Sequence, residues 1–109
     1  MNWYSIEMQT LGENKRDYEL DEQIGWELGF AESDIDERED YRMTATFESD
    51  LTLDQMKMRI KNLMAQLDTV AYIDVYYSES GDRLLTRSTV FSDGKIQNYR
   101  TKVYYEEEN

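Results

Sequence analysis

The segment that most restricts the fold is residues 52–77, where the apolar period changes from that of a helix to that of a strand. Over residues 52–67, apolar side chains recur every three or four positions, which predicts an amphipathic helix. Thr52 and Gln55 have the spacing of a capping box at its start. From residue 70 the period is two, which predicts a half-buried strand. Its core-facing positions are expected to be Ala71, Ile73, Val75 and Tyr77. A helix that leads directly into such a strand predicts a helix packed across a sheet.

Two strands and one weak helix are predicted before this segment. Alternating apolar and polar residues indicate strands at residues 2–11 and 41–47. Between them, apolar residues at every fourth position predict a short helix near residues 21–28, ended by Gly29 in a left-handed cap. Gly25, inside this helix, costs about 1 kcal/mol relative to alanine. The helix is therefore expected to be weak on its own.

The C-terminal half is predicted to be a meander of three strands. Ser80-Gly81 and Asp93-Gly94 mark two hairpin turns. If both are two-residue loops, Tyr77 lies opposite Leu84, and Asp74, Arg87 and Arg100 form one row on the face away from the helix. Opposed arginines repel each other, so this row requires a nearby acid.

These elements combine into an α+β fold of one domain, residues 1–109. We expect an antiparallel sheet of four to five strands, with the main helix at 52–67 on one face and a short helix near 21–28. The N-terminal strand either completes the sheet or pairs with residues 41–47. Residues 31–40 are almost all charged and are interpreted as a loop or a solvated helical turn.

The residue inventory excludes most catalytic and metal chemistry. The chain has no cysteine and no histidine, which removes disulfides, thiolate zinc sites, cysteine nucleophiles and imidazole bases. Acidic residues at positions 34, 36 and 40 resemble the start of a calcium loop, but Arg38 and Ala45 occupy ligand positions. We therefore expect no cofactor, no metal and no enzyme activity. With no long apolar run, we expect a cytoplasmic protein without a membrane segment.

The negative charge is unevenly distributed. The formal net charge is −12, and residues 17–50 hold thirteen acids against two arginines. Residues 51–105 hold eight basic and six acidic side chains. The folded molecule is therefore expected to be electrically two-sided.

This polarity predicts a binding protein whose acidic third docks on a basic surface of a nucleic-acid-handling protein. Carboxylates there would imitate phosphates without any direct contact to nucleic acid. No motif identifies a family, although the size and charge resemble in character the small acidic inhibitors that viruses make against nucleic-acid-binding proteins. A viral anti-defence protein, of anti-CRISPR or anti-restriction type, is the corresponding hypothesis. The predicted contact residues are Glu27, Glu32, Asp34, Asp36, Glu37, Glu39 and Asp40, with Trp26 and Phe30 as aromatic anchors.

Two alternatives stay open at this point. The sheet face away from the helix could bind single-stranded RNA by stacking and charge, through Tyr72, Tyr76, Arg87, Arg100 and Lys102. The acidic third could also be only a solvated surface of a structural domain. Monomer and dimer are both compatible with the sequence.

Overall fold

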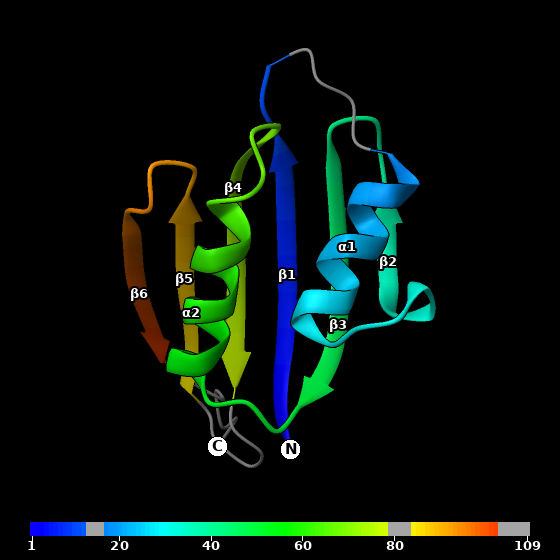
Figure 1. Cartoon of the computed structure of the whole chain (residues 1–109). Coiled ribbons are helices and arrows are strands. Elements are labelled where there is room, and N and C mark those ends of the chain that lie inside the picture. Colours follow the sequence, from blue (N-terminus) through cyan, green and yellow to red (C-terminus); the bar gives the residue numbers. More distant parts are fainter. Residues whose placement is uncertain (13–16, 79–83, 103–109) are drawn as a thin grey trace, which may run out of the picture.

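Six strands form one antiparallel sheet, and both α-helices lie on the same face of it (Figure 1). The computed structural model describes residues 1–12, 17–78 and 84–102, with the backbone alone at 84–85 and 100–102. The strand order is β2-β3-β1-β4-β5-β6. The strands are β1 (Asn2–Thr10), β2 (Ile35–Arg38), β3 (Arg42–Ser49), β4 (Val70–Ser78), β5 (Leu84–Phe91) and β6 (Ile96–Lys102). The helices are α1 (Tyr18–Leu28), the 3-10 turn η1 (Glu32–Asp34) and α2 (Leu53–Met64). The α+β prediction is confirmed, with one strand more than expected.

The N-terminal strand lies in the middle of the sheet. β1 pairs with β3 on one side and with β4 on the other. The N-terminal strand therefore completes the sheet and also pairs with the strand predicted at residues 41–47. Tyr4, Ile6 and Met8 point to the helix-covered face and are fully buried. The Tyr4 hydroxyl donates a hydrogen bond of 2.6 Å to the carbonyl of Leu51, just before α2. This bond joins the central strand to the start of the main helix.

The main helix begins where the sequence predicts. Thr52 Oγ1 accepts a hydrogen bond from Gln55 N at 3.2 Å, and Gln55 Oε1 accepts one from Thr52 N at 2.9 Å. Met56, Ile60 and Leu63 are buried against the sheet. Each such side chain contributes roughly 1.5–3 kcal/mol on burial, so the apolar stripe holds α2 in place.

The strand after α2 has the predicted core face at Ile73 and Val75, which are fully buried, and at Tyr77, which packs against the core. The prediction is wrong at its start, where Val70 is fully buried and Ala71 only half-buried. The pairing of β1 with β4 shifts there by one residue. Such a bulge exchanges the face of the residues beyond it.

The first helix starts earlier than predicted and is capped at both ends. Asp17 accepts a hydrogen bond from Leu20 N at 2.7 Å, so α1 begins at Tyr18 rather than at residue 21. Gly29 has a φ of +89° and forms the predicted left-handed cap. A Cβ atom on Gly25 would lie 2.8 Å from the backbone oxygen of Phe30. Gly25 is therefore required by the chain reversal that follows the helix.

The charged segment after α1, predicted to be a loop or a solvated helical turn, contains a short helical turn and also a strand that was not predicted. Residues 32–34 form η1 and residues 35–38 form β2, which pairs with β3 at the edge of the sheet. The pairing shifts between Ile35 and Glu37. An irregular edge strand that is charged and paired on one side lacks the alternation by which strands are recognised.

The predicted register of the meander is wrong at both hairpins. Tyr77 lies opposite Thr86, two residues from the prediction, which preserves the faces; the connection at residues 79–83 lies outside the described residues. At the second hairpin, Gly94 N donates to Phe91 O and Phe91 N donates to Lys95 O, each at 2.9 Å. This three-residue loop has Gly94 at a φ of +87°. It holds one residue more than predicted and shifts β6 by one position.

The shifted register separates the two arginines that were expected to oppose each other. Tyr99 lies opposite Arg87, and Arg100 pairs with Thr86. The side chains of Arg100 and Lys102 lie outside the described residues.

Candidate partner-binding surface

The acid-rich third of the chain folds into one edge of the molecule. It forms α1, η1, β2 and β3, and β2 is the outermost strand on that side of the sheet (Figure 1). The predicted carboxylates follow each other from the last turn of α1 to the turn before β3. We name these seven, together with the exposed Glu22 of α1, the acidic edge: Glu22, Glu27, Glu32, Asp34, Asp36, Glu37, Glu39 and Asp40. The fold thus brings together the carboxylates that the sequence singled out.

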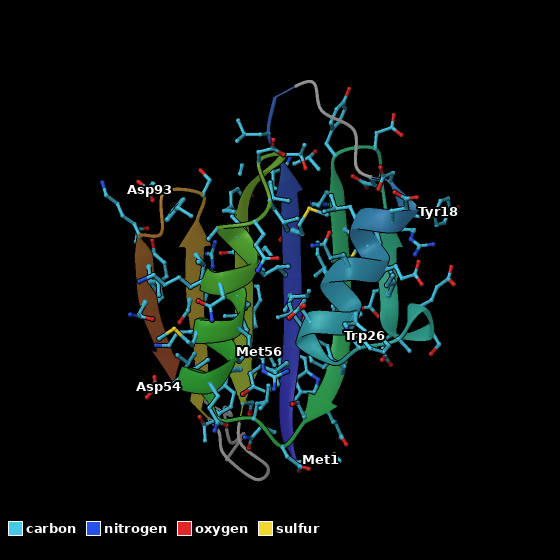
Figure 2. All side chains as sticks on the ribbon, in the orientation of Figure 1. Met1, Tyr18, Trp26, Asp54, Met56 and Asp93 are labelled. Atoms are coloured by element: carbon cyan, nitrogen blue, oxygen red, sulfur yellow. The ribbon has the colours of Figure 1, made fainter. Side chains whose placement is uncertain are left out.

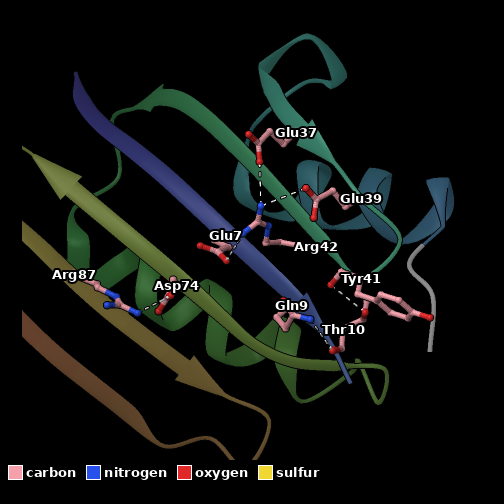
Figure 3. Close-up of polar contacts among 9 residues, drawn as sticks. All are labelled: Glu7, Gln9, Thr10, Glu37, Glu39, Tyr41, Arg42, Asp74 and Arg87. Atoms are coloured by element: carbon pink, nitrogen blue, oxygen red, sulfur yellow. Dashed lines mark hydrogen bonds and ion pairs between the residues drawn. The ribbon is translucent and has the colours of Figure 1, made fainter. Parts of the chain in front are cut away.

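Arg42 is shared by several carboxylates of this region (Figure 3). Its Nη2 atom lies 3.3 Å from Glu37 and 3.4 Å from Glu39, and its Nη1 atom lies 3.8 Å from Glu7. All four side chains are partly exposed. Because exposed ion pairs contribute only about 0–1 kcal/mol, these contacts leave the glutamates able to exchange partners. One guanidinium for three carboxylates also leaves a negative excess.

Asp34 and Asp36 support the local structure. Asp34 accepts a hydrogen bond from the backbone N–H of Ala31 at 2.9 Å, at the start of η1. Asp36 accepts one from the hydroxyl of Thr46 at 2.6 Å, across the β2–β3 pair. A carboxylate has about four acceptor positions, so each retains capacity for a further donor. Changing either residue would nevertheless perturb the fold.

On the helix side, Arg38 of β2 is held against α1. Its Nε donates to the buried carboxylate of Asp21 at 3.0 Å, and its Nη1 donates to Glu32 at 3.0 Å. The guanidinium carbon lies 4.6 Å from the ring centroid of Tyr18. Burial disfavours the charge, but the bonds and the negative charge of Glu32 and Asp21 outweigh it and raise the pKa of Arg38. Arg38 therefore ties strand to helix as a permanent cation.

A cavity of about 320 Å³ opens between α1 and β2, next to Arg38. Its apolar wall is formed by Tyr18, Gly25, Trp26, Phe30 and Ile35. Its charged lining consists of Asp21, Glu22, Glu32 and Arg38. The cavity thus joins aromatic surface to a charged rim in which acids outnumber the base.

The two predicted aromatic anchors occupy different places. Trp26 is 86% exposed, which leaves its ring on the surface beside the cavity. Phe30 is only 7% exposed and packs against Phe47, with ring centroids 5.2 Å apart, although it also lines the cavity. Of the two, Trp26 has the accessible surface that an anchor needs.

Sequence reasoning missed part of this surface. Tyr18, Glu22 and Arg38 line the cavity but were not among the predicted contact residues. Tyr18, Glu22 and Trp26 are spaced four apart, and this spacing places them on one face of a helix. A helix predicted to begin near residue 21 includes Glu22 and Trp26 but not Tyr18, so the prediction does not place all three on one face.

The described residues of the predicted alternative site, Tyr72, Tyr76 and Arg87, belong to β4 and β5 of the sheet. Arg87 Cζ lies 5.6 Å from the ring centroid of Tyr76 and 5.4 Å from that of Tyr99. Arg87 also donates to the buried Asp74 at 2.9 Å, which raises the pKa of Arg87, and Thr89 donates to the same carboxylate. Tyr72 lies nearby, and burial raises its pKa. The acid predicted to balance Arg87 is therefore Asp74, within the sheet.

The described part of the chain contains neither a group of metal-binding acids nor a helix that could span a membrane. Within residues 1–12, 17–78 and 84–102, no group of three or more acids is placed to hold a metal ion. No helix in the same ranges has the length and apolar content needed to cross a bilayer. Comparison of the chain with protein-family models, with curated proteins and with solved structures found no match.

Proposed function

We propose that this chain is a non-enzymatic binding protein that docks the acidic edge on a basic surface of a nucleic-acid-handling protein. A groove that binds nucleic acid presents lysine and arginine to phosphates. An edge rich in carboxylates occupies such a groove by offering acceptors to the same donors. The protein then acts as an inhibitor, because nucleic acid and the acidic edge compete for one surface. A nuclease of a defence system inhibited by a viral protein is the setting that suits this activity.

One observation carries this proposal: a dense run of carboxylates lies along a single edge beside an 86% exposed tryptophan. The two arginines of residues 17–50 cannot neutralise the thirteen acids of that segment. Their partners include Asp21, Glu32, Glu37 and Glu39. A negative field on one side of the molecule therefore remains available to a partner.

The geometry suits a two-stage encounter. An uneven field orients the molecule at a distance and raises the rate of association with a basic surface. At contact, Trp26 supplies apolar area of the kind that concentrates binding energy in interfaces. Single carboxylates at the rim each contribute little. We therefore expect binding that depends on salt and on the sum of the charges.

The test combines capture of basic proteins with a matched charge reversal. The chain is immobilised and exposed to a host lysate at low and moderate salt, and captured proteins are challenged with duplex DNA. The test variant carries Glu22→Lys and Glu27→Lys on α1, and the control carries Asp54→Lys and Asp68→Lys, which change the net charge equally at exposed sites outside the acidic edge. We expect the test variant alone to lose a partner that DNA also displaces.

Equal loss with both variants would mean that only net charge matters. A partner that stays bound even after Asp34, Asp36, Glu37 and Glu39 are all changed to lysine would show that the acidic edge is not the contact, provided that the variant is folded by circular dichroism.

A second candidate, a sheet face that binds single-stranded RNA, rests on the stack of Tyr76, Arg87 and Tyr99. Its two described arginines, Arg42 and Arg87, are both already ion-paired with carboxylates. The face is therefore poor in cations for phosphates among the residues described. A gel-shift titration with short RNA at low salt decides between the candidates, because the acidic inhibitor should cause no shift.

A further inference from the structure

The cavity between α1 and β2 is small. At about 320 Å³ it lies at the lower end of the range for ligand pockets, about 300–1,000 Å³. Tyr18 and Trp26 stand at the two ends of α1 along its rim (Figure 2). This volume suits a long side chain better than a large cofactor.

Its aromatic surface is exposed in a way that the fold does not require. Tyr18 is 72% exposed and Trp26 is 86% exposed, so neither ring contributes much to the core. Large aromatic rings exposed beside a concave surface are typical of binding sites. Tyr18 already stacks with the guanidinium of Arg38, at 4.6 Å. One aromatic ring of the cavity lining therefore already stacks with a guanidinium group of the chain itself.

The net charge of the cavity lining favours a positively charged occupant. The charged side chains that line the cavity are three carboxylates, those of Asp21, Glu22 and Glu32, and the single guanidinium of Arg38. Arg38 holds Asp21 and Glu32 at 3.0 Å each, and Glu22 remains an exposed carboxylate at the rim. The lining keeps an excess of two negative charges. A cation is attracted to it, and an anion is repelled.

We infer that this cavity takes an arginine side chain of the partner, whose guanidinium stacks on Trp26 and pairs with the carboxylates of Glu22 and Glu32. This rests on the proposed function, because it names the group that the acidic edge recognises. Arginine suits the site better than lysine, since its planar guanidinium stacks on an aromatic ring and binds carboxylates through two N–H groups at once.

The experiment uses a small probe, so that it does not depend on any partner protein. The ¹⁵N-labelled chain is titrated with N-acetylarginine amide, and the indole N–H signals of Trp26 and Trp3 are followed by NMR. N-acetylcitrulline amide has nearly the same shape without the charge, and N-acetyllysine amide carries the charge without the planar group. We expect the Trp26 signal to move with the arginine probe, less with lysine and not with citrulline. Trp3 is an internal control on β1.

Two variants test the named contacts. Trp26→Ala is followed through the backbone amide of Glu22, and it should weaken the arginine probe about five- to tenfold. Because Trp26 is 86% exposed, the substitution is not expected to affect folding. The separate double variant Glu22→Gln with Glu32→Gln should also weaken binding of the arginine probe. An unchanged affinity in both variants, or equal shifts with citrulline, would overturn the assignment.

The outcome is separable from that of the proposed function. If the arginine probe leaves the Trp26 signal unmoved while Glu22→Lys with Glu27→Lys still abolishes capture, the arginine site is wrong and the acidic edge stands. If the probe binds at Trp26 but no basic protein is captured, the site stands as one for guanidinium groups and the proposed inhibitor role falls.

Discussion

Gly25→Ala is the substitution for which sequence and structure predict opposite signs. In a helix interior, alanine is favoured over glycine by about 1 kcal/mol. Sequence reasoning alone therefore predicts that the change stabilises α1. In the fold, the new Cβ atom would lie 2.8 Å from Phe30 O and 3.2 Å from the Phe30 ring. The structure predicts that the change is destabilising.

The magnitude follows from how firmly Phe30 is held. The backbone N–H groups of Gly29 and Phe30 both donate to the Gly25 carbonyl, at 2.8 and 3.0 Å, and Phe30 is buried. Phe30 therefore cannot move away from a Cβ atom at residue 25 without loss of these hydrogen bonds. Overpacking of this kind costs about 1–3 kcal/mol. After subtraction of the gain in helix propensity, of about 1 kcal/mol, we expect a net loss of about 0–2 kcal/mol, centred on about 1 kcal/mol, which lowers the Tm by roughly 4–8 °C.

Thermal and urea unfolding, followed by circular dichroism, measure this change. Gln23→Ala, at an exposed position of the same helix, is the control and should stay within about 0.5 kcal/mol of the parent. A Gly25→Ala protein that melts above the parent would refute the reasoning, because helix propensity would then outweigh the contact with Phe30.

Three further predictions concern the caps, the buried ion pair and alkaline pH. Thr52→Ala removes one bond of the capping box and should cost about 1 kcal/mol in urea unfolding. Arg38→Met leaves the buried Asp21 without its guanidinium and should cost about 3–5 kcal/mol by the same assay, whereas adding Asp21→Leu should restore most of the loss; a double variant as unstable as the single one would contradict this. Burial raises the pKa of the Tyr4 phenol, and the electrostatic effect of Tyr77 adds a smaller contribution in the same direction. The unfolded chain ionises this group from about pH 10 while the folded chain keeps its proton, so stability should fall above pH 10 by up to about 1.4 kcal/mol per pH unit. Urea unfolding between pH 8 and 11 measures this slope, and Tyr4→Phe should reduce it.

The part of the fold that the sequence predicts well is the part set by neighbours along the chain. Thr52 and Gln55 are three residues apart, and their reciprocal bonds need no distant partner. Gly29 caps α1 for an equally local reason, since a left-handed φ suits glycine. The clustering of carboxylates was also predictable, because consecutive elements of one chain segment pack at one edge of the sheet.

Distant contacts decided the rest. β2 becomes a strand only because β3 offers it an edge. One extra residue in the loop closed by Gly94 moves β6 by one position, and the short-range signal Asp-Gly does not report the loop length. The cavity exists because β2 brings Arg38 back against Asp21, seventeen residues earlier.

The sequence by itself determined the start of helix α2, the alternating strands around it and the chain segment in which the acids are concentrated, since each can be read from residues close together in the chain. Only the tertiary structure decided the strand register, the central place of β1 and the meeting of Trp26, Glu22 and Arg38 around one cavity. These depend on contacts between segments far apart in the chain, which no local pattern encodes.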